Sequence, residues 1–164
     1  IGTYGKIIGG GLPVGAVCAS EEVMKHIAPL GRVYQAGTLS GNPLCMISGI
    51  QTLNTAFEED VYSYIENDLG PYMDKTMANL KDTVKTPFHY KRVGSIFWIC
   101  PSSATEPKTY HDIKPESVQA FKEVYHAMLK NGVYLSPSVY EVGFLSLAHT
   151  KNDIDKLAKV LGEF

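Results

Sequence analysis

The sequence predicts a mixed fold, part α/β and part α+β, because amphipathic helical patterns and short strand patterns follow one another along its whole length. The chain has 164 residues and 45% of them are hydrophobic, which is the composition of an ordinary globular protein. Three spans differ in pattern: 1–42 is rich in glycine and β-forming residues, 43–86 is helical, and 87–164 mixes strands with helices. We therefore expect the end of one domain, connecting helices, and a smaller α+β domain.

The first span predicts two short strands and a helix. Residues 6–8 and 14–17 are β-forming and flank the glycine run 9–11, so we expect strands on either side of a tight turn. Residues 21–27 predict a short helix, for which Ser20 is the N-cap.

The second span has a well-marked helix start. Asn42 is a good capping residue, and Pro43 follows it at the first helical position, where proline is favoured. Apolar residues then recur at helical spacing as far as residue 84. Gly70 and Pro71 interrupt this series, so we expect a break or kink there.

The third span alternates strand and helix patterns. Residues 90–100 have a strand pattern. An amphipathic helix follows and is expected to end at Asn131 and Gly132. Short strands are expected at 133–135 and 144–148. A last helix begins after Thr150, with Asp153 at the capping-box position.

Composition also excludes several kinds of function. The net charge is −2, and no cluster of Lys and Arg predicts binding to nucleic acid. No apolar run approaches the roughly 20 residues of a membrane helix, so we do not expect a membrane protein. Three cysteines form no C-x-x-C pair, and no two histidines lie three or four residues apart. We therefore expect no metal site and a reducing compartment, the cytoplasm. The chain begins at Ile1 without a signal segment, from which we expect a processed product or a piece of a longer polypeptide.

Lys6, just before the glycine run 9–11, is the first candidate for chemistry. A lysine at the end of an apolar strand is partly desolvated, which favours its neutral amine and suits a nucleophile or base. The glycines allow a planar ligand to approach the backbone, although they match neither common phosphate-binding motif. The alternative is a surface lysine before a turn.

Two other places could bind a ligand. Residues 37–43 put a hydroxyl and backbone N–H groups before a helix N-terminus, where phosphate binds readily; the alternative is a plain turn and N-cap. Glu141 lies in an apolar, aromatic stretch, so it is either a loop residue facing water or a buried acid near a substrate cation.

Several stretches together resemble the class III pyridoxal-phosphate aminotransferases. GKIIGGGLPVGA (5–16) is similar to the segment that carries the cofactor lysine in this family. VYQAGTLSGNP (33–43) and GVYLSPS (132–138) resemble its glutamate-1-semialdehyde aminomutase branch, as do YEVGF (140–144) and AHT (148–150). The resemblance covers nearly the whole chain. It implies the C-terminal part of a fold type I transferase: the end of the large cofactor domain in 1–42, connecting helices, and a small C-terminal domain.

The resemblance also implies roles for four residues. Lys6 would hold pyridoxal 5'-phosphate covalently and then, as a free amine, carry the proton between substrate and cofactor. Gly37 and Thr38 would bind the cofactor phosphate across the interface of a homodimer. Glu141 would lie near the active site and influence which amine of the diamine intermediate is kept. The implied reaction moves an amino group within a small amino-aldehyde to give 5-aminolevulinate for tetrapyrrole synthesis, starting from pyridoxamine phosphate.

In the family the remaining cofactor contacts and the arginine for the substrate carboxylate precede the lysine segment, so we expect this chain to be inactive alone. VCAS (17–20) and WICP (98–101) differ from the aminomutase pattern, and the former is closer to other class III enzymes. Two alternatives follow: a class III aminotransferase that passes an amino group to a 2-oxo acid, and a non-catalytic α+β interaction domain.

Overall fold

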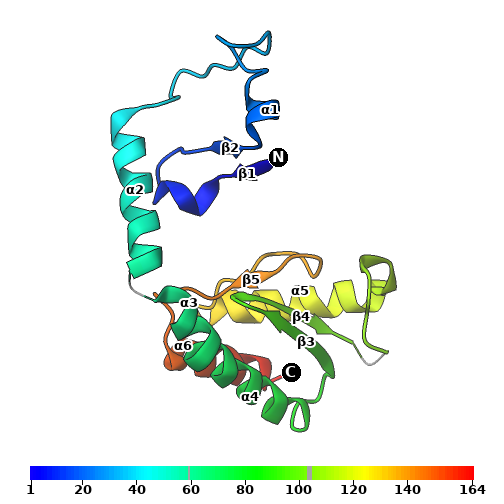
Figure 1. Ribbon diagram of the computed structural model, residues 1–164. Coiled ribbons are helices and arrows are strands. Elements are labelled where there is room, and N and C mark those ends of the chain that lie inside the picture. Colours follow the sequence, from blue (N-terminus) through cyan, green and yellow to red (C-terminus); the bar gives the residue numbers. More distant parts are fainter. Residues whose placement is uncertain (59, 103–104) are drawn as a thin grey trace. The chain divides into compact units, whose positions relative to one another are not determined.

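A computed structural model of the chain describes residues 1–58, 60–102 and 105–164 (Figure 1). The chain divides into two compact units, Ile1–Asp60 and Val61–Phe164. Helices and strands occur in both, which confirms the mixed fold class. The elements of the first unit, in chain order, are β1 (Gly2–Tyr4), the 3-10 helix η1 (Lys6–Gly9), β2 (Ala16–Cys18), α1 (Glu21–Met24) and α2 (Pro43–Glu58).

In the first unit, β1 and β2 form an antiparallel ribbon in which Tyr4 faces Ala16. Residues 6–8, predicted as a strand, form η1 instead. The reason is local: β1 has already ended at Tyr4, and the chain reverses at Gly10 and Gly11, whose φ values are +59° and +92°. The second strand begins two residues later than predicted, and α1 is shorter than predicted, although Ser20 precedes it as expected.

The start of α2 is as predicted. The side-chain oxygen of Asn42 accepts hydrogen bonds from the backbone N–H groups of Leu44, at 3.0 Å, and Cys45, at 3.3 Å. These bonds satisfy two of the N–H groups that a helix leaves without an internal partner.

The second unit begins with α3 (Val61–Tyr64), the π-helical turn η2 (Ile65–Leu69) and α4 (Gly70–Lys81). The predicted break at Gly70 and Pro71 is wrong, because the helix continues through it with a different hydrogen-bond pattern. The N–H of Gly70 donates to the carbonyl of Ile65, five residues back. A single wider turn of this kind relieves the clash that a proline ring makes with the preceding helical turn.

The strand predicted over 90–100 is a hairpin. Its strands are β3 (Phe88–Val93) and β4 (Ile96–Pro101), and Val93 pairs with Ile96 across a two-residue turn. Gly94 in this turn has φ +59°, the conformation that such tight turns require. A third strand, β5 (Gly143–Phe144), pairs antiparallel with β4, so the order is β3-β4-β5. It is shorter than the strand expected at 144–148, and the strand expected at 133–135 is irregular chain.

The helices α4, α5 (Pro115–Lys130) and α6 (Lys151–Leu161) complete the core of the second unit. α5 follows the short 3-10 helix η3 (Tyr110–Asp112) and packs on β4 and on α6. α4 packs on β3 and α6. As predicted, α5 ends at Asn131 and Gly132, and Thr150 and Asp153 form the capping box of α6. The most deeply buried side chains of the larger core cluster are Leu69, Met73, Met77, Val124 and Met128.

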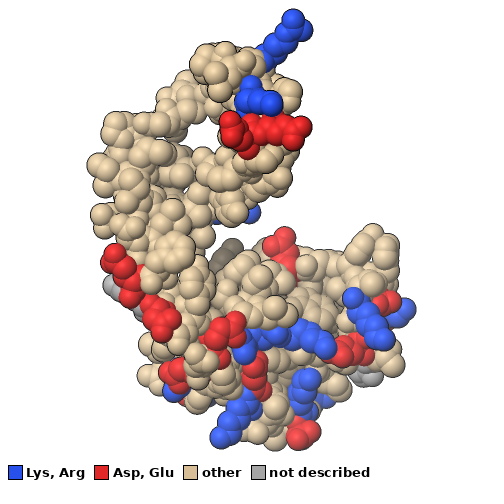
Figure 2. Space-filling model, viewed as in Figure 1, with Lys and Arg blue, Asp and Glu red and all other residues tan. Residues whose placement is uncertain are grey.

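Charge is unevenly spread over the surface. Figure 2 shows that the first unit is largely uncharged on the face in view, whereas Lys, Arg, Asp and Glu are interspersed over the second. Across the described ranges, no helix is both long and apolar enough to cross a membrane.

Candidate functional site

Lys6 is the first residue of η1 and is exposed to solvent, so the expectation of a partly desolvated amine is wrong for this chain. Exposure follows from its place, since the residue leaves β1 for a turn rather than continuing an apolar strand. Its backbone has φ +54°, in the left-handed region. A residue other than glycine, asparagine or aspartate rarely adopts this conformation, and strained residues of this kind cluster at functional sites.

The turn that carries Lys6 is seated on α2. The Ser48 hydroxyl donates to the carbonyl of Gly9, with an Oγ–O distance of 2.9 Å. Gly10 approaches the helix so closely that a Cβ there would overlap Thr52 Oγ1 and lie 2.8 Å from Ser48 Oγ. Only glycine fits this position, which explains one member of the glycine run without any phosphate-binding role.

Gly37 and Thr38 lie in the loop that leads into α2. Residues 38–41 form a turn, in which the N–H of Ser40 donates to the Gly37 carbonyl at 3.0 Å. A Cβ at Gly37 would lie 2.9 Å from Ser40 Oγ, so a larger residue there would require the Ser40 side chain to rotate away. The first N–H groups of α2 are occupied by the Asn42 side chain, so they are not the phosphate donors that the sequence suggested.

This loop borders an open hollow of about 760 Å³ in the first unit. Four of its lining residues carry a hydroxyl group: Thr3, Tyr4, Thr38 and Ser40. Hydroxyl donors suit a phosphate, so the residues present fit part of a phosphate site. Within the part of the chain that the structure describes, Lys6 does not line this hollow. Lys6 and Thr38 of one copy are thus not brought together here.

Glu141 belongs to the second unit and is exposed in the turn before β5. The Ser136 hydroxyl donates to its Oε2 at 3.2 Å, and its own N–H donates to the Ser138 carbonyl at 3.0 Å. Of the two alternatives, the loop residue facing water is correct for this chain, and the buried acid is not. The reason is that the turn over 137–140 carries the side chain outward while its neighbour Val139 enters the core.

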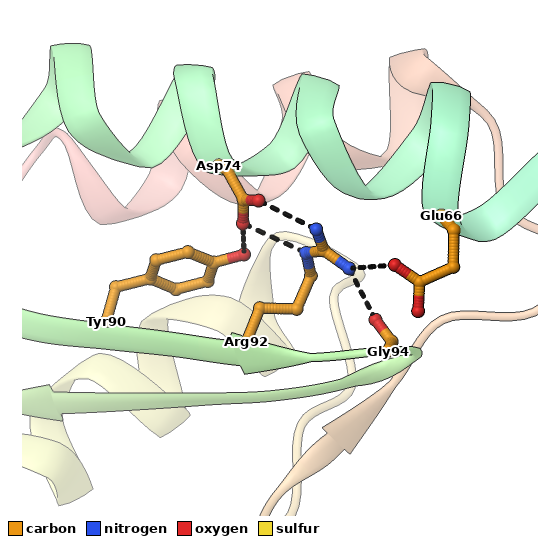
Figure 3. A network of polar contacts seen from close by, with 5 residues as sticks. All are labelled: Glu66, Asp74, Tyr90, Arg92 and Gly94. Carbon is orange, nitrogen blue, oxygen red and sulfur yellow. Dashed lines mark hydrogen bonds and ion pairs between the residues drawn. The ribbon is translucent and has the colours of Figure 1, made fainter.

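One polar network was missed by reasoning from the sequence. Arg92 on β3 binds Asp74 on α4 through two hydrogen bonds, Nε–Oδ1 at 3.0 Å and Nη2–Oδ2 at 2.8 Å (Figure 3). Tyr90 donates to the same carboxylate at 2.8 Å, and Arg92 also donates to the Gly94 carbonyl at 2.6 Å. Glu66 Oε2 lies 3.7 Å from Nη1 of Arg92.

The contacts among Asp74, Tyr90 and Arg92 shift the pKa values of these three side chains. The hydrogen bond from Arg92 lowers the pKa of Asp74, and the same bond raises the pKa of Arg92. Burial, and then the bond to Asp74, raises the pKa of Tyr90. The network ties a helix to the edge of the sheet and keeps the ions paired, which is a structural role. Residues 90 and 92 lie two apart in a strand and therefore face the same side of the sheet. This spacing was the one feature of the sequence that could have indicated a shared partner.

A metal centre has no support in the described ranges, where no three His, Cys, Asp or Glu side chains are grouped to hold an ion.

Comparison with known proteins gives consistent results. The family model described as "Aminotransferase class-III" matches residues 1–162. A glutamate-1-semialdehyde 2,1-aminomutase of Clostridium beijerinckii is 41% identical over 163 residues, which are 99% of this chain and 38% of that protein. The enzyme of the same name from Thermus thermophilus is 40% identical over 161 residues, 98% of this chain and 38% of that protein. The chain thus spans 38% of the length of these two relatives.

Solved structures show the same fold. An omega-transaminase from Sphaerobacter thermophilus matches with a TM-score of 0.81 at 25% identity, over 98% of this chain and 36% of that one. A β-phenylalanine aminotransferase from Variovorax paradoxus matches with a TM-score of 0.77 at 24% identity, over the same shares of the two chains.

Proposed function

The chain belongs to the class-III aminotransferase family, and we propose that it is the lysine-bearing C-terminal part of a glutamate-1-semialdehyde 2,1-aminomutase. The observation that carries this proposal is the identity of 40–41% to two enzymes of that name along nearly the whole chain. The reaction moves an amino group from C2 to C1 of glutamate-1-semialdehyde and gives 5-aminolevulinate for tetrapyrrole synthesis. The cofactor is pyridoxal 5'-phosphate, and the place of action is the cytoplasm.

Lys6 is the residue that holds this cofactor. Its amine is exposed and extends from a backbone that is fixed against α2, so its point of attachment is defined while its reach is flexible. A neutral primary amine attacks a carbonyl carbon, and the same Nζ, once released, accepts and returns a proton. When bound, the cofactor supplies an electron sink for the carbanion that proton removal creates at the substrate carbon.

Gly37 and Thr38 bind the cofactor phosphate. The Thr38 hydroxyl and the tight turn after Gly37 offer donors at one wall of the hollow in the first unit. As the family resemblance implies, the lysine and the phosphate loop of one site come from two copies, and Lys6 is not among the residues of the described chain that line that hollow. The active form is accordingly a homodimer in which each site is shared.

Glu141 acts on the substrate side. Its carboxylate is exposed, and the Ser136 hydroxyl holds one of its oxygens, so it is available to orient the ammonium group of a substrate. This role separates the two amines of the diamine intermediate, of which only one is kept in the product. We expect the 164 residues alone to be inactive.

A second candidate is an aminotransferase that passes its amino group to a 2-oxo acid. Residues 17–20, which lead from β2 into α1, depart from the aminomutase pattern and favour this alternative.

A chimera separates the two. The corresponding residues of the Clostridium beijerinckii enzyme are replaced by this chain, and formation of 5-aminolevulinate from glutamate-1-semialdehyde is measured. An aminomutase forms 5-aminolevulinate without any 2-oxo acid, whereas an aminotransferase passes the amino group to an added 2-oxo acid and forms the corresponding amino acid instead. Lys6→Arg in the same chimera keeps the charge, removes the reactive amine and serves as the matched control. A folded, dimeric chimera that is inactive with and without a 2-oxo acid would contradict both candidates.

A further inference from the structure

We propose that Ser48 on α2 is a positioning residue for Lys6, acting through the backbone of the turn η1. This inference rests on the proposed role of Lys6 as the cofactor lysine. Ser48 follows Lys6 by 42 residues in the sequence. We infer that it holds the backbone from which the lysine side chain extends.

The contact itself is polar and specific. Ser48 Oγ lies 2.9 Å from the Gly9 carbonyl oxygen and 3.4 Å from that of Gly10. Gly9 is buried, and within the turn its carbonyl also accepts the backbone N–H of Leu12 at 3.0 Å. The Ser48 hydroxyl is the side-chain group that ties this carbonyl to the helix.

This end of the turn also packs closely on the helix. A Cβ at Gly49 would lie 3.0 Å from the carbonyl oxygen of Ile8, and a Cβ at Gly10 would overlap Thr52 Oγ1. Backbone and helix thus meet closely, and at Gly10 the φ of +59° favours glycine as well. Thr52 in turn donates to the Ser48 carbonyl at 2.9 Å, which keeps its own side chain in place.

The other end of the turn is fixed as well. Tyr4 ends β1 and pairs with Ala16 of β2, and Gly5 continues in an extended conformation, with φ −168°. Lys6 is the residue at which the chain changes direction between these two anchors, and it does so with φ +54°. A conformation of this kind persists only where the surroundings determine it from both sides.

The consequence concerns the direction of the lysine side chain. The left-handed backbone conformation of Lys6 determines the direction of its Cα–Cβ bond, and hence of the side chain that begins there. Without the Ser48 hydroxyl, the segment from Ile8 to Gly10 is free to lift from α2, and Lys6 relaxes to a common backbone conformation that points its amine elsewhere.

The test follows the backbone of Lys6 directly. NMR of the chain measures the strength of the NOE between the amide proton and Hα of Lys6, which is strong in the left-handed region. We expect the signal in the wild type, its loss in Ser48→Ala, and its return in Ser48→Thr, which keeps a hydroxyl. Thr55→Ala removes an exposed hydroxyl from the same helix and is the matched control. A left-handed Lys6 that survives in Ser48→Ala would overturn the proposal.

A second readout links position to reactivity. Each variant is treated with pyridoxal 5'-phosphate over a range of pH and reduced with borohydride, and the label at Lys6 is compared with that at exposed Lys25 by peptide mapping. Loss of one hydrogen bond lowers the ratio by roughly two- to tenfold in Ser48→Ala, with recovery in Ser48→Thr. An unchanged ratio would also overturn the proposal. A wild-type ratio near one instead contradicts the role given to Lys6, and the NMR result then decides the role of Ser48 by itself.

Discussion

The hydroxyl of Ser48 and the carbonyl of Gly9 are joined by a hydrogen bond of 2.9 Å across 39 residues of sequence. Gly9 belongs to the turn that begins with Lys6, and Ser48 belongs to α2, the helix that follows the loop of Gly37 and Thr38. The turn of Lys6 is therefore seated on α2.

Gly10→Ala should destabilise the first unit more than Gly11→Ala. An added Cβ at Gly10 overlaps Thr52 Oγ1, whereas at Gly11 it meets nothing within 4 Å. We expect a loss of roughly 1–3 kcal/mol for Gly10→Ala, as for other overpacked sites, and about 1 kcal/mol for Gly11→Ala from its left-handed φ alone. Urea unfolding of the two variants measures the difference. Equal losses would show that α2 does not constrain the turn.

Lys6→Gly should be more stable than Lys6→Ala. Both variants lose the amine, but only glycine accepts φ +54° without strain. A left-handed residue with a Cβ costs roughly 1–2 kcal/mol, and the greater flexibility of glycine in the unfolded chain offsets part of this gain. The expected advantage in the free energy of unfolding is about 1 kcal/mol, measured by urea titration. A more stable Lys6→Ala would mean that Lys6 is not left-handed in solution.

The sequence predicted the elements whose signals are local. The start of α2 was readable from Asn42 and Pro43, and the capping box of α6 from Thr150 and Asp153, because each signal lies within four residues of the bond that it predicts. The strand expected over residues 6–8 is wrong because β1 has already ended at Tyr4 and the chain reverses at Gly10 and Gly11. The end of the resulting turn is held by Ser48, a partner that lies 39 residues away from Gly9 in the sequence. No residue pattern within η1 predicts that its partner, Ser48, lies on α2.

The candidate site shows the same division. The family resemblance pointed to Lys6, Gly37, Thr38 and Glu141 from short motifs. The exposure of Lys6 and Glu141 could not be derived in this way, because exposure depends on which other segments cover a residue. The close packing of Gly10 against Thr52 could not be predicted either, because a glycine in a run of glycines is explained as readily by a turn as by close packing of the backbone against another segment.

Asp74→Asn should weaken the second unit, and the effect should disappear in acid. Arg92 lowers the pKa of Asp74, so the folded state binds fewer protons at this carboxyl than the unfolded state does. The stabilisation is complete above the ordinary pKa of about 3.9 and is lost as the pH falls through the lower value of the folded state. Because the side chain is 44% exposed, we expect only about 1 kcal/mol at pH 7.

Urea unfolding of wild type and Asp74→Asn, at neutral pH and again below pH 3, measures this difference (Figure 3). Thr76→Ala, on the same helix, provides a control without the carboxylate. A difference between wild type and Asp74→Asn that stays constant or grows in acid would contradict the assignment.

Alkylation should report on the two units separately. Cys18 on β2 is exposed, whereas Cys45 on α2 and Cys100 on β4 are buried. Burial also raises the pKa of the Cys100 thiol, which leaves less of the reactive thiolate. We expect Cys18 alone to react quickly in the native chain, followed by Cys45 when the first unit opens and Cys100 when the second unit opens. Peptide mapping after stepwise denaturation measures the order. Reaction of Cys100 at the rate of Cys18 would be inconsistent with the core described above.

The most direct test of the central claim is to identify the lysine that carries the cofactor. The active chimera is reduced with borohydride in the presence of pyridoxal 5'-phosphate, and the modified peptide is sequenced by mass spectrometry. We predict that the label lies on Lys6 and that Lys6→Arg abolishes it. A label on another lysine, or one that persists undiminished in Lys6→Arg, would contradict the account.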